Sequence, residues 1–143
     1  MMKFYLVFNL DNKRIFSANI ELVYEFFMQF NIEEDLKKHI LERINKESDF
    51  EISISELERI KPALEEKIDQ LIIDINFNPF KERLRKLYPI QYNSDPFVWK
   101  NTTYYLYVKT NPIDSQISRI RSFLINLEYF KNHNQSIKYI FKH

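Results

Sequence analysis

Residues 3–18 read KFYLVFNLDNKRIFSA, two apolar runs separated by four polar residues. The first run places phenylalanine or leucine at every second position from Phe4 to Leu10, which is the period of a β-strand. Asp11 and Asn12 then favour a tight turn before the second run begins. The stretch therefore predicts a β-hairpin over residues 3–18.

Apolar residues at helical spacing follow this hairpin. They predict a helix over residues 20–30, after Asn19 as its N-cap. Because this segment is rich in valine, tyrosine and phenylalanine, a second strand is the alternative. A second helix is predicted over residues 32–46, and a short strand or extended linker begins at residue 50.

One apolar face continues in phase over residues 56–75, through Pro62. It includes Ile75, and Ser55 with Glu58 has the spacing of a capping box. We expect one kinked helix here; two helices with Pro62 in the first turn of the second are the alternative. Periodicity and turn residues further predict a basic helix over 80–88, a hairpin over 97–109, a helix over 113–131 and a strand over 136–141.

These elements predict an α+β fold. The length of 143 residues is close to the commonest domain size, which favours a single compact domain over residues 1–143. We expect a mostly antiparallel sheet, built from the two hairpins and the C-terminal strand and packed with about five helices.

The absence of glycine and cysteine excludes several classes of site. A P-loop, a dinucleotide-binding glycine turn and a GxSxG nucleophile elbow all need glycine. Disulfides, thiolate nucleophiles and cysteine-ligated zinc need cysteine. With no signal peptide or membrane span recognisable, we expect a cytoplasmic protein that binds no membrane and no cofactor.

The histidines offer little to catalysis. His39 shares a helical face with Asp35, but no third ligand or general base accompanies this pair. His133 lies in an asparagine-rich turn, and His143 is the last residue of the sequence. We therefore predict no enzyme activity, no catalytic residue and no metal site.

Charge is segregated along the chain although the net charge is only +1. Residues 32–75 hold 13 acidic and 7 basic residues, whereas residues 76–143 hold 4 acidic and 11 basic ones. On a helical wheel Glu58, Glu65 and Asp69 fall on one side of the predicted helix as a carboxylate stripe. We interpret this stripe as the binding site for a cationic partner; pairing of the two charged halves with each other is the alternative.

The basic half offers a second candidate surface. Lys81, Arg83, Arg85 and Lys86 fall within six residues and are followed by Tyr88. Lysine and arginine neutralise phosphates while aromatic rings stack on bases, so this segment could bind RNA or single-stranded DNA. No nucleic-acid-binding motif accompanies it.

The C-terminal helix has a second, partly apolar side with Ile125 and Tyr129. We expect this side to be buried; an exposed patch is the alternative.

By elimination, the sequence favours a non-catalytic protein-binding module. Its size and charge are similar in general terms to those of bacterial immunity and antitoxin proteins, which bind and neutralise a toxin, often a basic nuclease. In this interpretation Glu58, Glu65 and Asp69 contact the toxin. The alternative is binding of RNA or single-stranded DNA by the basic segment and Tyr88, and the sequence leaves the oligomeric state open.

Overall fold

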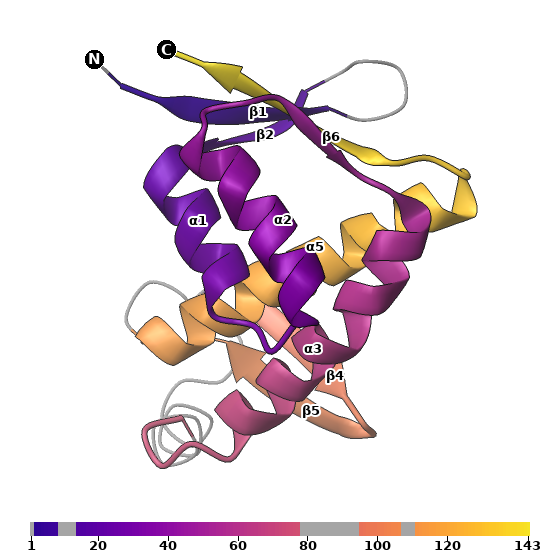
Figure 1. Ribbon diagram of the computed structural model, residues 1–143. Helices are drawn as coiled ribbons and strands as arrows, with labels where there is room; N and C mark the ends of the chain where they lie inside the picture. Colours follow the sequence, from indigo (N-terminus) through magenta and orange to yellow (C-terminus); the bar gives the residue numbers. More distant parts are fainter. Residues whose placement is uncertain (1, 9–13, 78–94, 107–110) are drawn as a thin grey trace. The chain divides into compact units, whose positions relative to one another are not determined.

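A computed structural model describes residues 2–8, 14–77, 95–106 and 111–143 (Figure 1). Its contacts divide the chain into two compact units. The first comprises Met1–Leu64 and Ile125–His143, and the second comprises Glu65–Leu124.

The first unit contains a four-stranded antiparallel sheet with the strand order β2-β1-β6-β3. The predicted N-terminal hairpin is confirmed as β1 (Phe4–Phe8) and β2 (Arg14–Asn19), and β3 (Phe50–Ile52) forms the other edge. The C-terminal strand β6 (Ile137–Lys142) lies between β1 and β3, so it is a central strand with no free edge.

The inner face of this sheet carries an aromatic cluster. The rings of Phe50 and Tyr139, opposite each other on β3 and β6, stack with centroids 4.6 Å apart. Tyr5 of β1 meets both rings edge-on, and Phe27 lies 6.0 Å from Tyr139. Because these side chains are fully or almost fully buried, they form the core between sheet and helices.

Two helices cover the inner face of the sheet, as Figure 1 shows. The first, α1 (Ile20–Met28), is the predicted helix and not the alternative strand, and Asn19 caps it by accepting a hydrogen bond from the backbone N–H of Glu21. The second, α2 (Glu34–Asn45), begins after Glu33 without a side-chain cap.

Helix α3 (Ile54–Ile72) runs unbroken through Pro62, as the apolar periodicity predicts. Its capping box is Ser53 with Glu56, two residues before the predicted pair: the Ser53 hydroxyl accepts from the Glu56 N–H, and the Glu56 carboxylate accepts from the Ser53 N–H. Because the helix ends at Ile72, the predicted burial of Ile75 is wrong, and its side chain is 78% exposed.

The predicted second hairpin is present as β4 (Asp95–Trp99) with β5 (Thr102–Leu106). It forms a two-stranded sheet of its own, so the prediction that both hairpins belong to one sheet is wrong. Lys100 and Asn101 adopt positive φ angles of 48° and 69° in its turn. Asparagine takes this conformation at lower cost than most residues other than glycine, which this chain lacks.

Helix α5 (Pro112–Asn132) follows Asn111, whose side-chain oxygen accepts from the backbone N–H of Ile113 and, at 3.4 Å, of Asp114. This side-chain acceptor satisfies backbone groups that have no partner inside the helix.

The α+β class and the antiparallel strands are confirmed. In the described ranges the helices are α1, α2, α3 and α5; the predicted helix over 80–88 lies outside them. A single domain over residues 1–143 stays a prediction. None of the helices described is long and apolar enough to cross a membrane.

Candidate functional site

The three carboxylates of the predicted stripe all lie on α3 but have different surroundings. In the first unit, an oxygen of Glu58 lies 3.4 Å from Nζ of Lys131 on α5. Both side chains are about half exposed, at 52% and 41% respectively. The cationic partner of Glu58 is therefore a residue of the same chain. The helical pattern of the stripe gave no indication of it.

Asp69 is bound more closely, within the second unit. Its Oδ1 accepts a hydrogen bond of 2.8 Å from the indole Nε1 of Trp99, and its Oδ2 lies 2.7 Å from Nζ of Lys100. The hydrogen bonds from Lys100 and then Trp99 lower the pKa of Asp69. Asp69 therefore anchors the turn of the β4–β5 hairpin to α3.

Glu65 is half-buried, and no hydrogen bond or ion pair of its side chain is found among the described residues. Two of the three carboxylates thus already have a lysine partner. An external cation can therefore bind the stripe in two ways. It can displace the lysine from Glu58 or Asp69, or it can contact Glu65.

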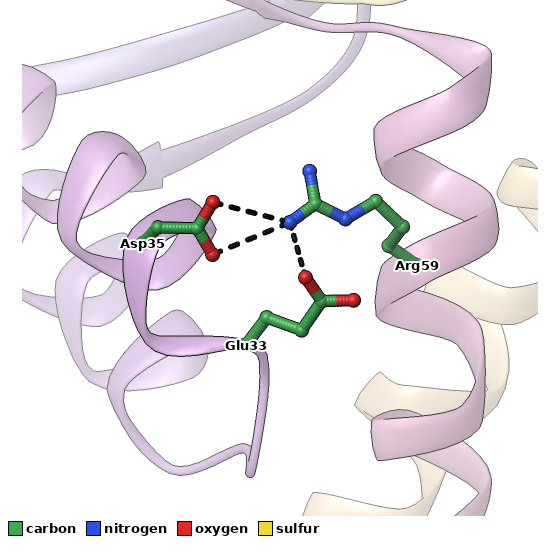
Figure 2. A network of polar contacts seen from close by, with 3 residues as sticks. All are labelled: Glu33, Asp35 and Arg59. Atoms are coloured by element: carbon green, nitrogen blue, oxygen red, sulfur yellow. Dashed lines mark hydrogen bonds and ion pairs between the residues drawn. The ribbon is translucent and has the colours of Figure 1, made fainter.

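A second acidic group surrounds Arg59 and lies wholly in the first unit (Figure 2). Arg59 of α3 donates to the carboxylate of Glu33, just before α2, and to both oxygens of Asp35 at 3.3 and 3.4 Å. The hydrogen bond to Glu33 is the main reason why the pKa of Arg59 is raised. The network joins the start of α2 to α3. These acids therefore hold the two helices together, in addition to interacting favourably with the dipole of α2.

The basic segment of the alternative hypothesis, Lys81, Arg83, Arg85, Lys86 and Tyr88, lies outside the described residues. Its role in binding nucleic acid stays a prediction.

A cavity of about 530 Å³ lies beside the edge strand β3. Its carboxylates have partners: Asp49 accepts from the backbone N–H of Phe141 at 2.8 Å, Glu56 caps α3, and Glu51 lies 3.9 Å from Nζ of Lys138. The Ser53 hydroxyl serves as the helix cap. The lining residues are His39, Arg43, Asp49, Phe50, Glu51, Ser53, Glu56, Lys138 and Ile140.

The serine and the carboxylates that line this polar cavity therefore already have hydrogen-bond or ion-pair partners within the protein. Within the described ranges, no group of three or more histidine, aspartate or glutamate side chains is placed to hold a metal ion. The predictions of no catalysis and no cofactor remain predictions.

Helix α5 exposes the side on which Ile125 and Tyr129 lie, so the predicted burial of that side is wrong. Ile125 is 59% exposed and Tyr129 is 44% exposed, because the helix buries Leu127 and Phe130 instead. The ring of His133 lies 4.2 Å from that of Tyr129, and its Nδ1 is 2.8 Å from the Tyr129 carbonyl oxygen. We call Ile125, Tyr129 and His133, spaced four residues apart, the α5 stripe.

Comparisons with protein-family models, with curated proteins and with solved structures give no significant match.

Proposed function

We propose that this protein is a non-catalytic module that binds another protein through the α5 stripe. The observation that carries the proposal is the exposure of Ile125 and Tyr129 one helical turn apart. Side chains four residues apart on a helix are neighbours, so the two form one continuous apolar surface. Such surfaces mark interaction sites, and tyrosine is enriched among the residues that dominate binding energy.

The close, tilted contact between the rings of His133 and Tyr129 supports this role. A tyrosine held by a neighbouring ring loses less side-chain entropy when a partner covers it. The α5 stripe therefore offers a partly ordered aromatic anchor beside an aliphatic one.

For the partner we propose a basic toxin, such as a nuclease, which this protein neutralises as an immunity or antitoxin-type protein. In support, Glu58 on α3 is paired with Lys131, a residue of the same helix as the α5 stripe, and no other ion pair of Glu58 is found among the described residues. Exposed ion pairs of this kind contribute about 0–1 kcal/mol, so a cationic side chain of a partner can replace the lysine at small cost. Glu65 and Asp69 complete the proposed acidic contact.

The first experiment is affinity capture from the native cell lysate, with and without nuclease treatment. The expected result is one stoichiometric protein that survives the nuclease and is lost with Ile125→Asp or Tyr129→Ala. Leu22→Asp is the matched control, because Leu22 is an equally exposed aliphatic residue, at 53%, on α1. Capture that is unchanged by both α5 substitutions would overturn the proposal.

The acidic contact has a separate test. Glu58→Lys and Glu65→Lys are combined with Asp69→Asn, which keeps an oxygen acceptor for Trp99. We expect a slower association rate and a weaker salt dependence of binding to the captured partner. Unchanged affinity and unchanged association would remove these carboxylates from the interface and leave the α5 stripe untouched.

A further inference from the structure

The sheet of the first unit has an outer face that none of the described helices of that unit covers. In Figure 1, α1 and α2 both lie on the opposite side of the sheet. Tyr5 and Tyr139 are buried, and Tyr139 contacts Phe27 of α1, so these two tyrosines face the helices. Successive side chains of a strand point to opposite faces, so the neighbours of these two tyrosines point outward. The outer face is formed by Phe4, Leu6 and Phe8 of β1 with Lys138, Ile140 and Lys142 of β6.

The strand register alternates rings and cations on this face. Phe4 lies opposite Lys142, and Phe8 lies opposite Lys138, while Leu6 and Ile140 face each other between them. Directly opposite residues have Cβ atoms about 5 Å apart. Each phenylalanine is therefore directly opposite a lysine, and both phenylalanines are on a central strand of the sheet.

Of the two lysines on this face, Lys142 is free to act on a ligand, whereas Lys138 is directly opposite Glu51 of β3. Lys142 is exposed, and no partner for its ammonium group is found in the part of the chain that the structure describes. Lys138 is 3.9 Å from Glu51, at the β3 edge of the sheet, which is a long contact for an ion pair. Ser17 and Asn19 of β2 add uncharged polar groups beside β1.

This chemistry fits nucleic acid better than protein. Lysine is depleted in protein–protein interfaces, whereas it supplies phosphate contacts in nucleic-acid complexes. Aromatic rings on an open sheet stack on unpaired bases, and every base has a face to stack. The α5 stripe, by contrast, contains no lysine or arginine.

We propose that the outer face of this sheet binds single-stranded RNA or DNA, with bases stacked on Phe4 and Phe8 and phosphates on Lys138 and Lys142. The proposal is independent of protein binding by the α5 stripe and of the basic segment over residues 81–86. We propose that the sheet binds nucleic acid and does not catalyse a reaction on it.

The test is fluorescence anisotropy of labelled ten-nucleotide oligouridine and oligothymidine with the whole chain. We expect binding at about 50 mM salt that weakens steeply toward about 200 mM. Replacing both lysines, Lys138→Gln with Lys142→Gln, should lower the slope of log affinity against log salt by about 1.4, because each phosphate contact on a single strand contributes about 0.7. Phe4→Leu with Phe8→Leu should weaken binding about tenfold or more through lost stacking.

Lys38→Gln is the matched control, because Lys38 is an exposed lysine on α2, away from this face. Thermal unfolding checks that every variant is folded. The proposal would be overturned if the wild type did not bind at about 100 µM protein, where even non-specific binding is usually seen. Equal losses for Lys38→Gln and the paired lysine variant would also overturn it. So would full binding by both outer-face double variants, which would place the nucleic acid elsewhere. If sedimentation instead shows a dimer that Phe4→Leu with Phe8→Leu dissociates, and oligonucleotides do not compete, the face joins two copies and the proposal is wrong.

Discussion

Trp99 and Asp69 are joined by a hydrogen bond of 2.8 Å between the indole Nε1 and Oδ1. The hydrogen bonds from Lys100 and Trp99 lower the pKa of Asp69 from its ordinary value of 3.8. A carboxyl group whose pKa is lowered by folding stabilises the fold above its unfolded-state pKa, and that contribution is lost as pH falls through the folded-state pKa.

We therefore expect the free energy of unfolding to decrease below about pH 4 in part because Asp69 is protonated. Since the side chain is 42% exposed, this part is small, on the order of 0.2–1 kcal/mol as for other exposed pairs. Urea unfolding at a series of pH values should show a shallower acid decrease for Asp69→Asn than for the wild type. Glu66→Gln, on the same helix, is the control, and an identical pH profile for Asp69→Asn and wild type contradicts this assignment.

The Arg59 network should stabilise the contact between α2 and α3 in a salt-dependent way. Because all its side chains are partly exposed, Arg59→Gln is expected to lower the free energy of unfolding slightly at low ionic strength and by less in about 1 M salt. A double-mutant cycle of Arg59→Gln with Asp35→Asn measures the coupling. Glu34→Gln serves as control, since Glu34 is also in the first turn of α2; equal coupling of Glu34 and Asp35 to Arg59 would show a general charge effect.

The buried hydroxyl of Tyr5 should be worth more than that of Tyr139. Tyr5 donates a 2.9 Å hydrogen bond to the carbonyl of Ser48, and the described residues offer no such bond to Tyr139. Tyr5→Phe is expected to cost about 1 kcal/mol, the usual net contribution of a hydrogen bond, while Tyr139→Phe costs less. Chemical unfolding of both variants at neutral pH decides this, and a larger loss for Tyr139→Phe would refute it.

Alkaline titration of the same tyrosine offers an independent check. Burial, with the charges of Asp49 and Glu47, raises the pKa of Tyr5 to about 12. Because the raised pKa favours the neutral phenol, Tyr5 stabilises the fold below its ordinary pKa of 10.0, and this contribution is lost as pH rises toward 12. Absorbance near the phenolate band should show a late step that is smaller in Tyr5→Phe than in the wild type, because Tyr139, whose pKa is also raised by burial, still ionises late in the variant. A wild-type titration completed near pH 10 would contradict this.

Pro62 should weaken α3 at an exposed position. Proline has no N–H to donate inside a helix and is about 3 kcal/mol less favourable there than alanine. We expect Pro62→Ala to raise the free energy of unfolding by about 1 kcal/mol or more, the gain being reduced by the greater freedom of the unfolded chain. Gln70→Ala is the control, because Gln70 is exposed on the same helix and its replacement changes helix propensity without adding a backbone donor. An equal effect of both substitutions on the free energy of unfolding would argue against a missing hydrogen bond at Pro62.

Local sequence patterns predicted the elements well, because the period of apolar residues is a local property. The hairpin at residues 3–18 and the passage of α3 through Pro62 follow from alternation and helical phase alone. The pattern did not predict the end of α3, because the apolar periodicity continues to Ile75. In the structure the chain turns before that residue, and Asp74 accepts a hydrogen bond from the backbone N–H of Asn76 in this turn.

The candidate site depended on contacts that no local pattern contains. Glu58 meets Lys131, and Asp69 meets Lys100, each across a long stretch of sequence. A helical wheel places the three carboxylates on one side of a helix but says nothing of the cations that other elements bring there. The exposure of Ile125 was missed for a related reason: Phe130 takes the buried side of α5, which a wheel centred on aliphatic residues does not indicate.

The position of β6 also bears on how the protein is made. The hairpin β1–β2 and the edge strand β3 have no strand pairing with each other, and each pairs with β6. A ribosome delivers residues 137–142 after all the other strands, so the sheet cannot be completed while they are still to be translated. Until then the rings of Tyr5 and Phe50 lack their contact with Tyr139, which lies on the strand between theirs. In the nascent chain these two rings are therefore available for non-native contacts.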